Sequence, residues 1–599
     1  MIPTKHNAET VNVGHPSAVY ITGQGSVRGF RDVDRSLIRF LNIPYATVTE
    51  RWRQASPVNP WLGVRDATRY GPMCPQTLAR KGTGLTKLFG IPAVNDGFQY
   101  SFSERDCLNL SIYVPLLDAP PPVSGIPVIV FIHGGKLRHG GNAHPVYDMS
   151  NFVHASVKAN QPVIVVVINY RLGCLGYFAS RELAFEFDSD PDNILHLRTH
   201  DQDPAFGNWG LADQKLAFEW VREHIWVFGG NASNITAMGY SGGGTAIMNH
   251  MLIQSHHGLF SRAIVHSGGA GLIFARYAYF QCQKIFDHLH NHIQAENAPM
   301  ATGSEKTPNG SDLGQELLQR AQTLRGISAD ILMQVPELKG IDSILYPNLD
   351  NKVLFPSPQS LIARDSHHYD PGVKSVIFAT TKDEGTLFAG THGATDICQW
   401  QSFLDRWVSP KLHQEVEAIY GKPQTGADAR SFSSKILGDI FAAYPTNSAC
   451  EGFLAQDDRQ RLLYRVYVDR SLKAVDNMQL DLGVAHGTDM GFATMSDLSQ
   501  QYMTEQEKAF GYRVMEKYFR FAYGLEDEAT PGDPHTVGWK AGCKDGRVAT
   551  VWSEDFEFRA GAFERMDERT IELWRRNEEW VAQKRPPQSL GSTHSRPML

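Results

Sequence analysis

The amino-acid sequence predicts an α/β fold with a large, mostly parallel central sheet flanked by helices. Two observations support this prediction: short runs of solid apolar residues, and intervening segments whose apolar residues recur at helical spacing. Strands of a parallel sheet are covered on both faces, so they read as continuous apolar runs rather than as alternating patterns. The runs that fit are residues 110–114, 128–132, 163–168, 235–238 and 376–379.

The segments around these runs complete the pattern. Residues 17–50 contain short alternating runs interrupted by glycines, which is typical of antiparallel strands, so we expect an antiparallel region at one edge of the sheet. Residues 211–227 carry apolar side chains at helical spacing and predict a helix between two strands. Residues 563–581 predict an amphipathic helix near the C-terminus.

The domain organisation follows from the absence of linkers and repeats in the 599 residues. We expect one domain over residues 17–582, with disordered ends at residues 1–16 and 583–599. Two polar segments, residues 181–206 and 291–312, fit the pattern poorly. We expect them to loop over the surface and to border the substrate entrance.

The composition excludes several functional classes. The net charge of −7 and the scattered Lys and Arg residues provide no basic face for a nucleic acid. The longest apolar runs fall far short of the about 20 residues that a membrane-spanning helix needs. The seven cysteines lack the paired spacing of a zinc site, so we expect no metal and no cofactor. No secretory signal is visible before Val11, which predicts a cytoplasmic location.

The clearest chemical motif is Gly-Tyr-Ser-Gly-Gly at residues 239–243. An apolar run precedes it, and residues 244–253 can form a helix, which together give the strand, sharp turn and helix that expose a nucleophilic serine. Glycines two positions either side of the serine avoid side-chain clashes in this turn. Ser241 is therefore the predicted nucleophile. The alternative is a glycine-rich turn that holds an ordinary serine.

A second glycine-rich loop, His133-Gly134-Gly135, directly follows the apolar run 128–132. Acyl transfer requires donors for the oxyanion of the tetrahedral intermediate, and backbone N–H groups of such a loop can supply them. The expected donors are the N–H groups of Gly135, Lys136 and Gly242. The alternative is a tight turn at the end of a strand.

A serine nucleophile needs a base, and the base needs a carboxylate to orient it. Glu384 follows the run 376–379 and would lie at the C-terminal end of a strand, where α/β sheets build their sites. His486 lies in a loop-like sequence further on, which gives the order serine, acid, histidine. Composition alone does not single out His486 from the 23 histidines of the chain.

Many ordered motifs resemble the type-B carboxylesterase family, which includes the cholinesterases and certain fungal lipases. The resemblance runs from about residue 17 to about residue 560. Besides the serine motif, the matching segments are FLNIPYA at 40–46, WLGVRDATRYGPMCPQ at 61–76, SERDCLNLSIYVP at 103–115, NWGLADQ at 208–214, FGGN at 228–231, SRAIVHSG at 261–268, DEG at 383–385 and HGTD at 486–489.

This resemblance implies an α/β-hydrolase fold, and it implies roles for particular residues. It assigns Ser241, Glu384 and His486 to a catalytic triad. It assigns the backbone of Gly135, Lys136 and Gly242 to an oxyanion hole. It also implies that Ser267 is a polar group behind the triad, for which the alternative is a simple hydroxyl at a strand end.

Three departures from the family pattern concern substrate choice. Lys136 stands where the family usually has a third glycine, and Tyr240 stands where it usually has glutamate. The segment between Cys74 and Cys107, where cholinesterases carry a choline-binding tryptophan, contains no Trp. A cation-binding aromatic cage is therefore not supported, and we expect an uncharged or generic ester rather than a choline ester.

The family's first disulfide would pair Cys74 with Cys107. Disulfides persist in oxidising compartments, whereas this N-terminus shows no secretory signal. We expect the pair to be reduced in a cytosolic protein; the alternative is a different true N-terminus.

The leading functional hypothesis is hydrolysis of a small-molecule carboxylic ester through an acyl-serine intermediate. An acyltransferase or a cyclase of a biosynthetic pathway could use the same triad, and the sequence does not separate these activities. A non-catalytic binding module on the same fold is a third interpretation, but such relatives typically lose triad residues. The sequence leaves the acyl and alcohol groups of the substrate and the oligomeric state open.

Overall fold

The computed structural model describes residues 17–78, 92–118, 122–189, 207–269, 285–291, 312–334, 369–455, 461–473, 482–525, 548–560 and 566–583, apart from a few positions within these ranges. The two ends predicted to be disordered, residues 1–16 and 583–599, and the polar segment 291–312 lie outside the described residues except at their borders. The single domain over residues 17–582 stays a prediction.

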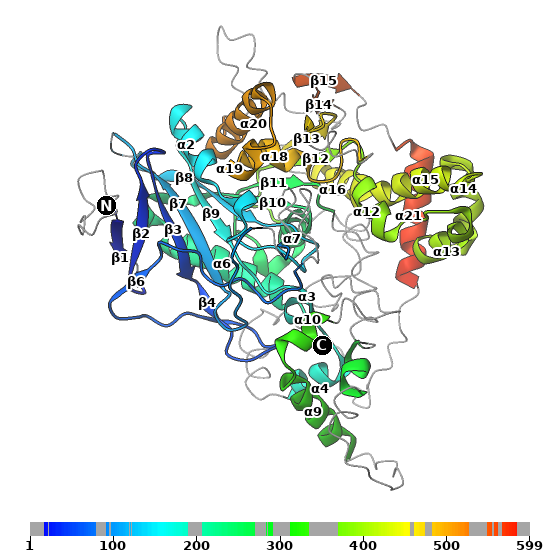
Figure 1. Ribbon diagram of the computed structural model, residues 1–599, viewed down its shortest axis with the longest axis horizontal. Coiled ribbons are helices and arrows are strands. Elements are labelled where there is room, and N and C mark those ends of the chain that lie inside the picture. The colour runs from blue at the N-terminus through cyan, green and yellow to red at the C-terminus, as the bar shows by residue number, and fades with distance from the viewer. Residues whose placement is uncertain are drawn as a thin grey trace.

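A 13-stranded sheet forms the centre of the molecule, in the order β1-β2-β3-β7-β9-β8-β10-β11-β12-β13-β14-β15, with β6 paired to β2 (Figure 1). The strands are β1 Ser17–Ile21, β2 Ser26–Asp32, β3 Leu37–Pro44, β6 Val64–Asp66, β7 Asn109–Pro115, β8 Ile126–Ile132, β9 Ile164–Ile168, β10 Gly230–Tyr240, β11 Arg262–His266, β12 Ser375–Thr381, β13 Leu462–Val468, β14 Val548–Trp552 and β15 Phe556–Ala560. A separate pair joins β4 (Ala46–Thr47) to β5 (Ser56–Pro57).

The middle of the sheet is parallel and its two ends are antiparallel. Strands β9, β8, β10, β11, β12, β13 and β14 pair in parallel. Strands β1, β2, β3 and β7 at one end and β15 at the other pair antiparallel, except that the short β6 joins β2 in parallel. This confirms the predicted α/β fold and its antiparallel N-terminal region.

One strand differs from the prediction in its direction. Residues 110–114, interpreted as part of the parallel set, lie in β7, which runs antiparallel to both β3 and β9. Every residue of β7 is nevertheless buried. Burial depends on the layers that cover a strand and not on its direction, so a solid apolar run cannot distinguish the two cases.

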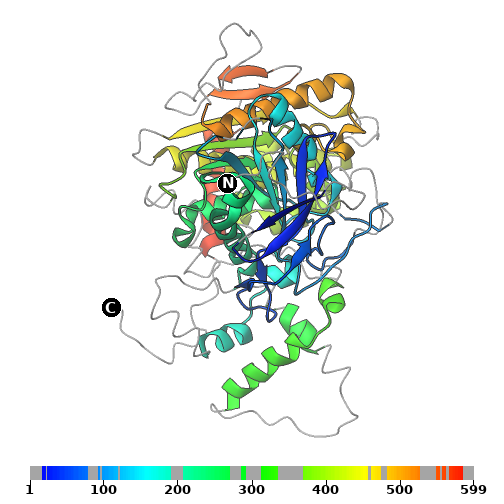
Figure 2. The same ribbon diagram turned by 90° about the vertical axis from the view of Figure 1, so that its left-hand side faces the viewer.

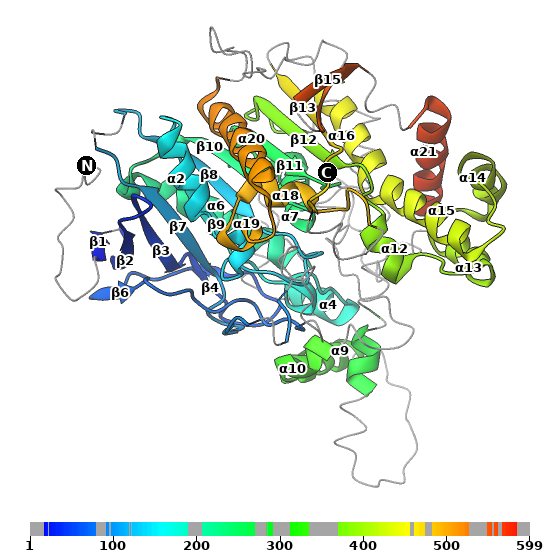
Figure 3. The ribbon, with the colours of Figure 1, turned by 45° about the horizontal axis from the view of Figure 1, so that its top comes forward.

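Helices cover both faces of the sheet, as the tilted view shows (Figure 3). Helices α6 (Trp209–His224), α7 (Gly242–Leu252) and α16 (Tyr444–Ala455) contribute to the core on one face. Helices α2 (Ser150–Lys158), α18 (Thr488–Thr494), α19 (Asp497–Gln500) and α20 (Glu505–Tyr523) cover the other face. Helix α20 begins with a reciprocal capping box in which Thr504 and Glu507 satisfy each other's backbone N–H groups.

A helical lobe lies beside the C-terminal end of strand β12 (Figure 1). It comprises α12 (Thr386–His392), α13 (Ile397–Trp407), α14 (His413–Tyr420), α15 (Gly426–Gly438) and α21 (Glu568–Gln583), which share an apolar cluster of their own. Between α15 and α16, residues Asp439–Ala443 form a turn of π-helix. The predicted C-terminal helix thus exists and begins at Glu568.

A smaller group of helices extends away from the sheet in two perpendicular views (Figures 1 and 2). It contains α4 (Arg181–Ser189), α9 (Asp312–Arg325) and α10 (Ala329–Gln334), while the short α3 (Gly173–Gly176) lies nearer the sheet. The structure corrects the expectation of a loop over residues 181–206, because the first nine of these residues form helix α4. Leu183 and Phe187, one turn apart, face the core, so four-residue apolar spacing outweighs the polar composition. Residues 190–206 lie outside the described residues.

Other sequence expectations differ only in detail. The helix predicted over residues 211–227 is α6, which ends at His224 and continues as a turn of 3₁₀-helix, Ile225–Phe228. Strands β11, β13, β14 and β15 were not predicted, because their apolar runs are short or mixed with polar residues. In the described part of the chain, no helix has the length and apolar character needed to cross a membrane.

Candidate active site

Ser241 occupies the sharp turn between β10 and α7. Its backbone adopts φ 53° and ψ −118°, a conformation that is costly for a residue with a Cβ. The turn is held by the N–H of Ser241, which donates to the carbonyl of His266 on the neighbouring strand at 2.8 Å. A Cβ at Gly239 would approach Gly243 O to 2.5 Å, and a Cβ at Gly243 would approach Ile132 O to 2.0 Å. The glycines therefore have the steric role that the sequence indicates.

Three predicted residues form one chain of hydrogen bonds. Ser241 Oγ lies 2.8 Å from His486 Nε2, and His486 Nδ1 lies 2.6 Å from Glu384 Oε2. A carboxylate accepts only, so His486 carries its proton on Nδ1 and presents the lone pair of Nε2 to the serine hydroxyl. All three side chains are nearly buried, between 4 and 8% exposed. Chemically, this arrangement can supply a nucleophile, a base and an orienting acid.

The second oxygen of Glu384 also has partners. Ser267 Oγ donates to Glu384 Oε1 at 2.6 Å, and the N–H of Thr381 donates to the same oxygen at 2.8 Å. Ser267 follows β11 and its backbone also adopts a positive φ, 46°. With His486, this carboxylate has three donors, which replace the water that burial removes from it.

The loops that carry Glu384 and His486 are joined by Asp383. Asp383 pairs with Ala485 in an isolated parallel bridge, and its N–H donates to Val484 O at 3.0 Å. Its side chain in turn accepts from the N–H of Val484 at 2.9 Å. Glu384 and His486 each directly follow one residue of this bridge. The bridge therefore holds them next to each other, although they are more than a hundred positions apart in the chain.

The predicted oxyanion loop turns back toward the serine. Gly135 has φ 109°, and Lys136 and Leu137 follow with φ 57° and φ 55°. A Cβ at Gly135 would lie 2.2 Å from His139 O, so only glycine fits there. A Cβ at Gly242 would lie 2.9 Å from Leu137 N, which shows that this loop runs directly beside the residue after the serine. The three expected donors therefore lie in two adjoining segments.

The N–H of Gly242 has a further property that suits this role. Gly242 is the first residue of α7, and the first N–H groups of a helix have no acceptor within that helix. The positive end of the helix dipole also lies at this position. Both effects favour a negatively charged oxygen next to Ser241.

Two aromatic rings flank the imidazole of His486. The centroid of the Tyr240 ring lies 5.2 Å from that of His486, and the centroid of Phe388, on α12, lies 5.0 Å away. Burial raises the pKa of the Tyr240 phenol well above its usual value, so the residue before the serine is uncharged. The walls around the base are thus aromatic and neutral.

A second buried polar chain lies beneath the serine turn. His266 Nδ1 lies 2.6 Å from Asp489 Oδ2, and His266 Nε2 lies 3.0 Å from the hydroxyl of Tyr518 on α20. His266 and Asp489 are completely buried. Since the carbonyl of His266 accepts a hydrogen bond from the N–H of Ser241, this chain of hydrogen bonds stabilises the serine turn.

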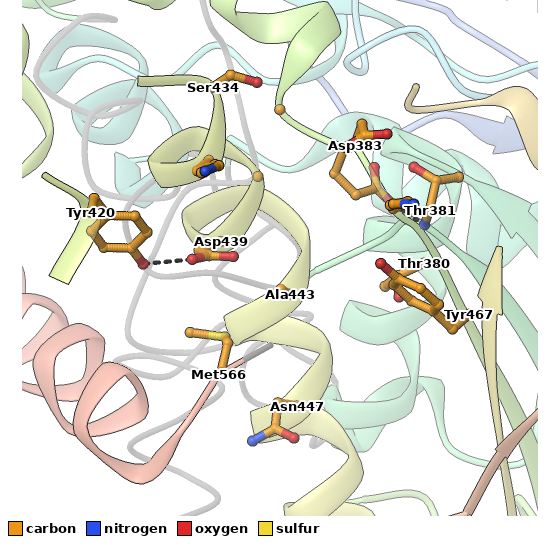
Figure 4. Close-up of a pocket in the computed structure, with 15 residues that line it drawn as sticks. Thr380, Thr381, Asp383, Tyr420, Ser434, Asp439, Ala443, Asn447, Tyr467 and Met566 are labelled. Carbon is orange, nitrogen blue, oxygen red and sulfur yellow. Dashed lines mark hydrogen bonds between the residues drawn. The ribbon is translucent and has the colours of Figure 1, made fainter. Parts of the chain in front are cut away.

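A cavity of about 340 Å³ lies on another side of Glu384, between the ends of β12 and β13 and the helical lobe (Figure 4). Thr380 and Thr381 line one wall; Tyr420 and Asp439, joined by a hydrogen bond of 2.5 Å, line the opposite wall. Neither Ser241 nor His486 lines it, so this cavity does not contain the predicted nucleophile.

Cys74 and Cys107 are buried free thiols in the structure. They lie side by side: a hydrogen bond with Cys74, together with burial, raises the pKa of the Cys107 thiol. The disulfide implied by the resemblance is therefore not formed here. The expected cytosolic location, from which the reduced state was predicted, stays a prediction. Within the described residues, no group of His, Cys, Asp and Glu side chains is arranged to hold a metal ion.

The sequence pattern of the carboxylesterase family matches residues 16–187 and 195–549 of this chain. The chain belongs to the carboxylesterase family. This membership agrees with the α/β-hydrolase architecture and with the ordered motifs found in the sequence. It classes the chain among the serine carboxylesterase-type hydrolases.

Individual carboxylesterases are similar over much of the chain. A cholinesterase of Mus musculus is 32% identical over 86% of this chain and 80% of its own length. A para-nitrobenzyl esterase of Bacillus subtilis is 29% identical over 62% of this chain and 63% of its own length. A fumonisin B1 esterase of Sphingopyxis macrogoltabida is 27% identical over 71% of this chain and 66% of its own length. The match thus spans less than two thirds of some of these relatives.

Sequence reasoning did not anticipate several groups around the site. Phe388, Thr381 and the pair His266–Asp489 contact it. His266 and Asp489 stand in the motifs at 261–268 and 486–489, but no role was predicted for either. Phe388 and Thr381 stand in no motif, and α12 begins at Thr386, after Glu384, so helical spacing does not link Phe388 to Glu384. The contact between His266 and Asp489 joins positions 223 residues apart and becomes visible only in the fold.

Proposed function

We propose that this carboxylesterase-family protein hydrolyses carboxylic esters through an acyl-serine intermediate, with Ser241 as nucleophile, His486 as general base and Glu384 as orienting acid. The observation that carries the proposal is the unbroken chain of hydrogen bonds from Ser241 Oγ through His486 to Glu384. The same constellation performs acyl transfer on unrelated folds, because its roles depend on geometry.

In the first half of the reaction, Ser241 Oγ attacks the ester carbonyl carbon while His486 Nε2 takes the hydroxyl proton. The tetrahedral intermediate carries its negative charge on the former carbonyl oxygen. Collapse of this intermediate breaks the bond to the alcohol oxygen, which takes the proton from His486 and leaves. The acyl group is then bound to Ser241 as an ester.

In the second half, water replaces the alcohol. His486 takes a proton from the water molecule as its oxygen attacks the acyl carbonyl, and the proton returns to Ser241 Oγ when the acid departs. Glu384 remains ionised throughout and stabilises the imidazolium, supported by the hydrogen bonds from Ser267 and Thr381.

For the oxyanion we assign the backbone N–H groups of Gly135, Lys136 and Gly242. The assignment is supported by the positive φ of Gly135 and Lys136, by the contact between this loop and Gly242, and by the position of Gly242 at the start of α7. Each donor of this kind contributes roughly 2.7–4 kcal/mol to transition-state stabilisation in a serine hydrolase.

The test replaces Ser241 with Ala and measures hydrolysis of a p-nitrophenyl ester. We expect turnover to fall to the level of a protein without a nucleophile, with an unchanged unfolding transition. Ser233→Ala, which alters an exposed serine on the same strand β10, is the matched control and should retain full activity. Full activity in Ser241→Ala would contradict the assignment.

Hydrolysis and acyl transfer share the acyl-serine and differ in the group that accepts the acyl. We propose water as the acceptor, since ester hydrolysis is the chemistry that carboxylesterases are named for. Product analysis in the presence of a primary alcohol tests this point. Free acid as the main product supports hydrolysis, whereas a new ester as the main product supports a transferase.

A further inference from the structure

The side-chain amide of Gln76 forms a pair of hydrogen bonds with the backbone of Gly140. Its Nε2 donates to Gly140 O at 2.8 Å, and the N–H of Gly140 donates to its Oε1 at 2.8 Å. Nε2 also donates to Cys74 O at 3.1 Å. Gln76 is buried, so little water competes for these hydrogen bonds. The donors and the oxygen of this amide therefore all have protein partners.

Gly140 closes the loop that carries the assigned oxyanion donors. This loop folds back on itself, because Gly135 O accepts the N–H of His139 at 3.0 Å. Gly140 has φ 105°, and a Cβ there would lie 2.8 Å from Gly134 O. The two ends of the loop are therefore in contact, and Gln76 fixes the end that lies beside Gly134.

The conformation of this loop needs support from outside it. Gly135, Lys136 and Leu137 have three consecutive positive φ angles, and two of these residues carry a Cβ. Such a backbone persists only where the surrounding structure fixes it. The N–H of Gly173 donates to Leu137 O at 2.8 Å and holds the loop at one point. The pair of hydrogen bonds from Gln76 holds it at another.

The segment that carries Gln76 is itself fixed against its neighbours. Met73 is fully buried, and its sulfur lies where a Cβ at Gly141 would be, so the segment packs directly against the end of the loop. Cys74 is buried as well, and its Sγ accepts the N–H of Leu172 at 3.3 Å. The amide of Gln76 therefore projects from a backbone that is held in place on both sides of the loop end.

We propose that Gln76 is a positioning residue for the oxyanion hole. It contacts no reacting atom and acts through the backbone of Gly140, which sets the position of the loop. The N–H groups of Gly135 and Lys136 are thereby fixed before negative charge develops on the ester oxygen. Donors that are placed in advance need no rearrangement in the transition state. This inference rests on the proposed function, because the oxyanion arises only when Ser241 attacks an ester.

Two substitutions remove different parts of this contact. Gln76→Met keeps the length of the side chain and removes its hydrogen bonds. Gln76→Glu keeps an acceptor for the N–H of Gly140, but its carboxylate has no N–H for Gly140 O.

The matched control is Asn577→Leu, in helix α21 of the helical lobe. Asn577 is also a buried amide that pairs with the backbone. Its Nδ2 donates to Trp407 O at 3.0 Å, and its Oδ1 accepts the N–H of Ser409 at 2.7 Å. This control therefore loses a comparable amide contact away from the oxyanion loop.

Each variant is measured with two probes. The kcat/KM for phenyl hexanoate reports the reaction, and the inhibition constant of 1,1,1-trifluoroheptan-2-one, which carries the same alkyl chain, reports the oxyanion hole. Ser241 Oγ adds to the ketone carbon, His486 takes the hydroxyl proton, and the ketone oxygen becomes an anion, as in the transition state. An inhibition constant does not depend on the amount of folded protein, so a loss of stability alone leaves it unchanged.

We expect kcat/KM to fall about tenfold or more in both Gln76 variants, and the inhibition constant to rise by a similar factor, because the donors are no longer held in place. Asn577→Leu should keep both values, even where urea unfolding shows a loss of stability. Unchanged values in the Gln76 variants, or equal changes in Asn577→Leu, would overturn the positioning role. An original protein that neither hydrolyses phenyl hexanoate nor binds the ketone would instead contradict the proposed function.

Discussion

Ser267 Oγ donates a hydrogen bond of 2.6 Å to Glu384 Oε1, the carboxylate oxygen that His486 does not contact. This relationship joins two strand ends that are 117 residues apart. It suggests that Ser267 acts on the reaction through Glu384, as a positioning residue, by holding the carboxylate in the plane that His486 requires.

Ser267→Ala should therefore lower kcat/KM about tenfold, since loss of a hydrogen bond to a buried charged group costs roughly 1.5–3 kcal/mol. Ser156→Ala is the matched control, because Ser156 is also buried and hydrogen-bonded, to Val153 O, but lies in α2 away from the site. Steady-state kinetics and urea unfolding on both variants check this. If Ser267→Ala and Ser156→Ala lose stability and kcat/KM to the same degree, a positioning role for Ser267 is contradicted.

Gly135→Ala should reduce kcat by about a hundredfold or more, the effect of losing one oxyanion donor. The new Cβ would meet His139 O at 2.2 Å, so the loop would have to move away from Ser241. Gly63→Ala is the control, since Gly63 also has a positive φ but its Cβ would meet nothing within 4 Å. The measurement is kcat for a neutral ester, and a Gly135→Ala variant as active as Gly63→Ala would disprove the assigned role.

The sequence predicted those parts of the site that are local in the chain. The turn around Ser241 follows from five consecutive residues between a strand and a helix, and the structure has that turn. Glu384 and His486 could be ranked only through the resemblance to the family and the order of elements. Their contact is created by the parallel bridge of Asp383 to Ala485, which no local pattern encodes.

The same distinction holds for the fold. Buried strands such as β8 and β12 were predicted because solid apolar runs require cover on both faces. The antiparallel direction of β7 was not, because pairing direction depends on distant connections. Helix α4 was not predicted because polar residues dominate its sequence. Leu183 and Phe187 face the core, but only the packed structure shows that this apolar pair is enough for a helix.

Asp213 and Arg171 form an ion pair that is almost fully buried, with two hydrogen bonds of 2.7 Å between the side chains. Asp213→Asn should lower the free energy of unfolding by about 3–5 kcal/mol, because it leaves the Arg171 charge buried without compensation. The exposed pair Arg575–Glu572 provides the control, and Glu572→Gln should leave stability nearly unchanged. Equal, small effects in urea unfolding would show that the buried pair is dispensable.

His250 and His256 contact each other at 2.7 Å between their Nδ1 atoms, and both rings are buried. Burial lowers the pKa of His250 to about 3 and lowers that of His256 as well. The unfolded chain therefore binds protons that the folded chain does not, starting near the ordinary histidine pKa of about 6.5. Stability is complete above this pH and should fall as the pH decreases toward 3.

The variant that isolates this effect is His250→Gln. Between pH 6 and pH 4, it should reduce the slope of unfolding free energy against pH by about 1.4 kcal/mol per pH unit, the value for one proton. His288→Gln, at an exposed position, is the control and should keep the original slope. Identical slopes in the two variants, measured by urea unfolding, would show that His250 does not contribute to acid sensitivity.

The most direct measurement is mass spectrometry of the protein quenched in acid during turnover of phenyl hexanoate. The triad geometry predicts a hexanoyl group on the peptide that contains Ser241, present in the original protein and absent from Ser241→Ala. A hexanoyl group on a different residue, or steady turnover by Ser241→Ala with no acyl-protein at all, would contradict the account.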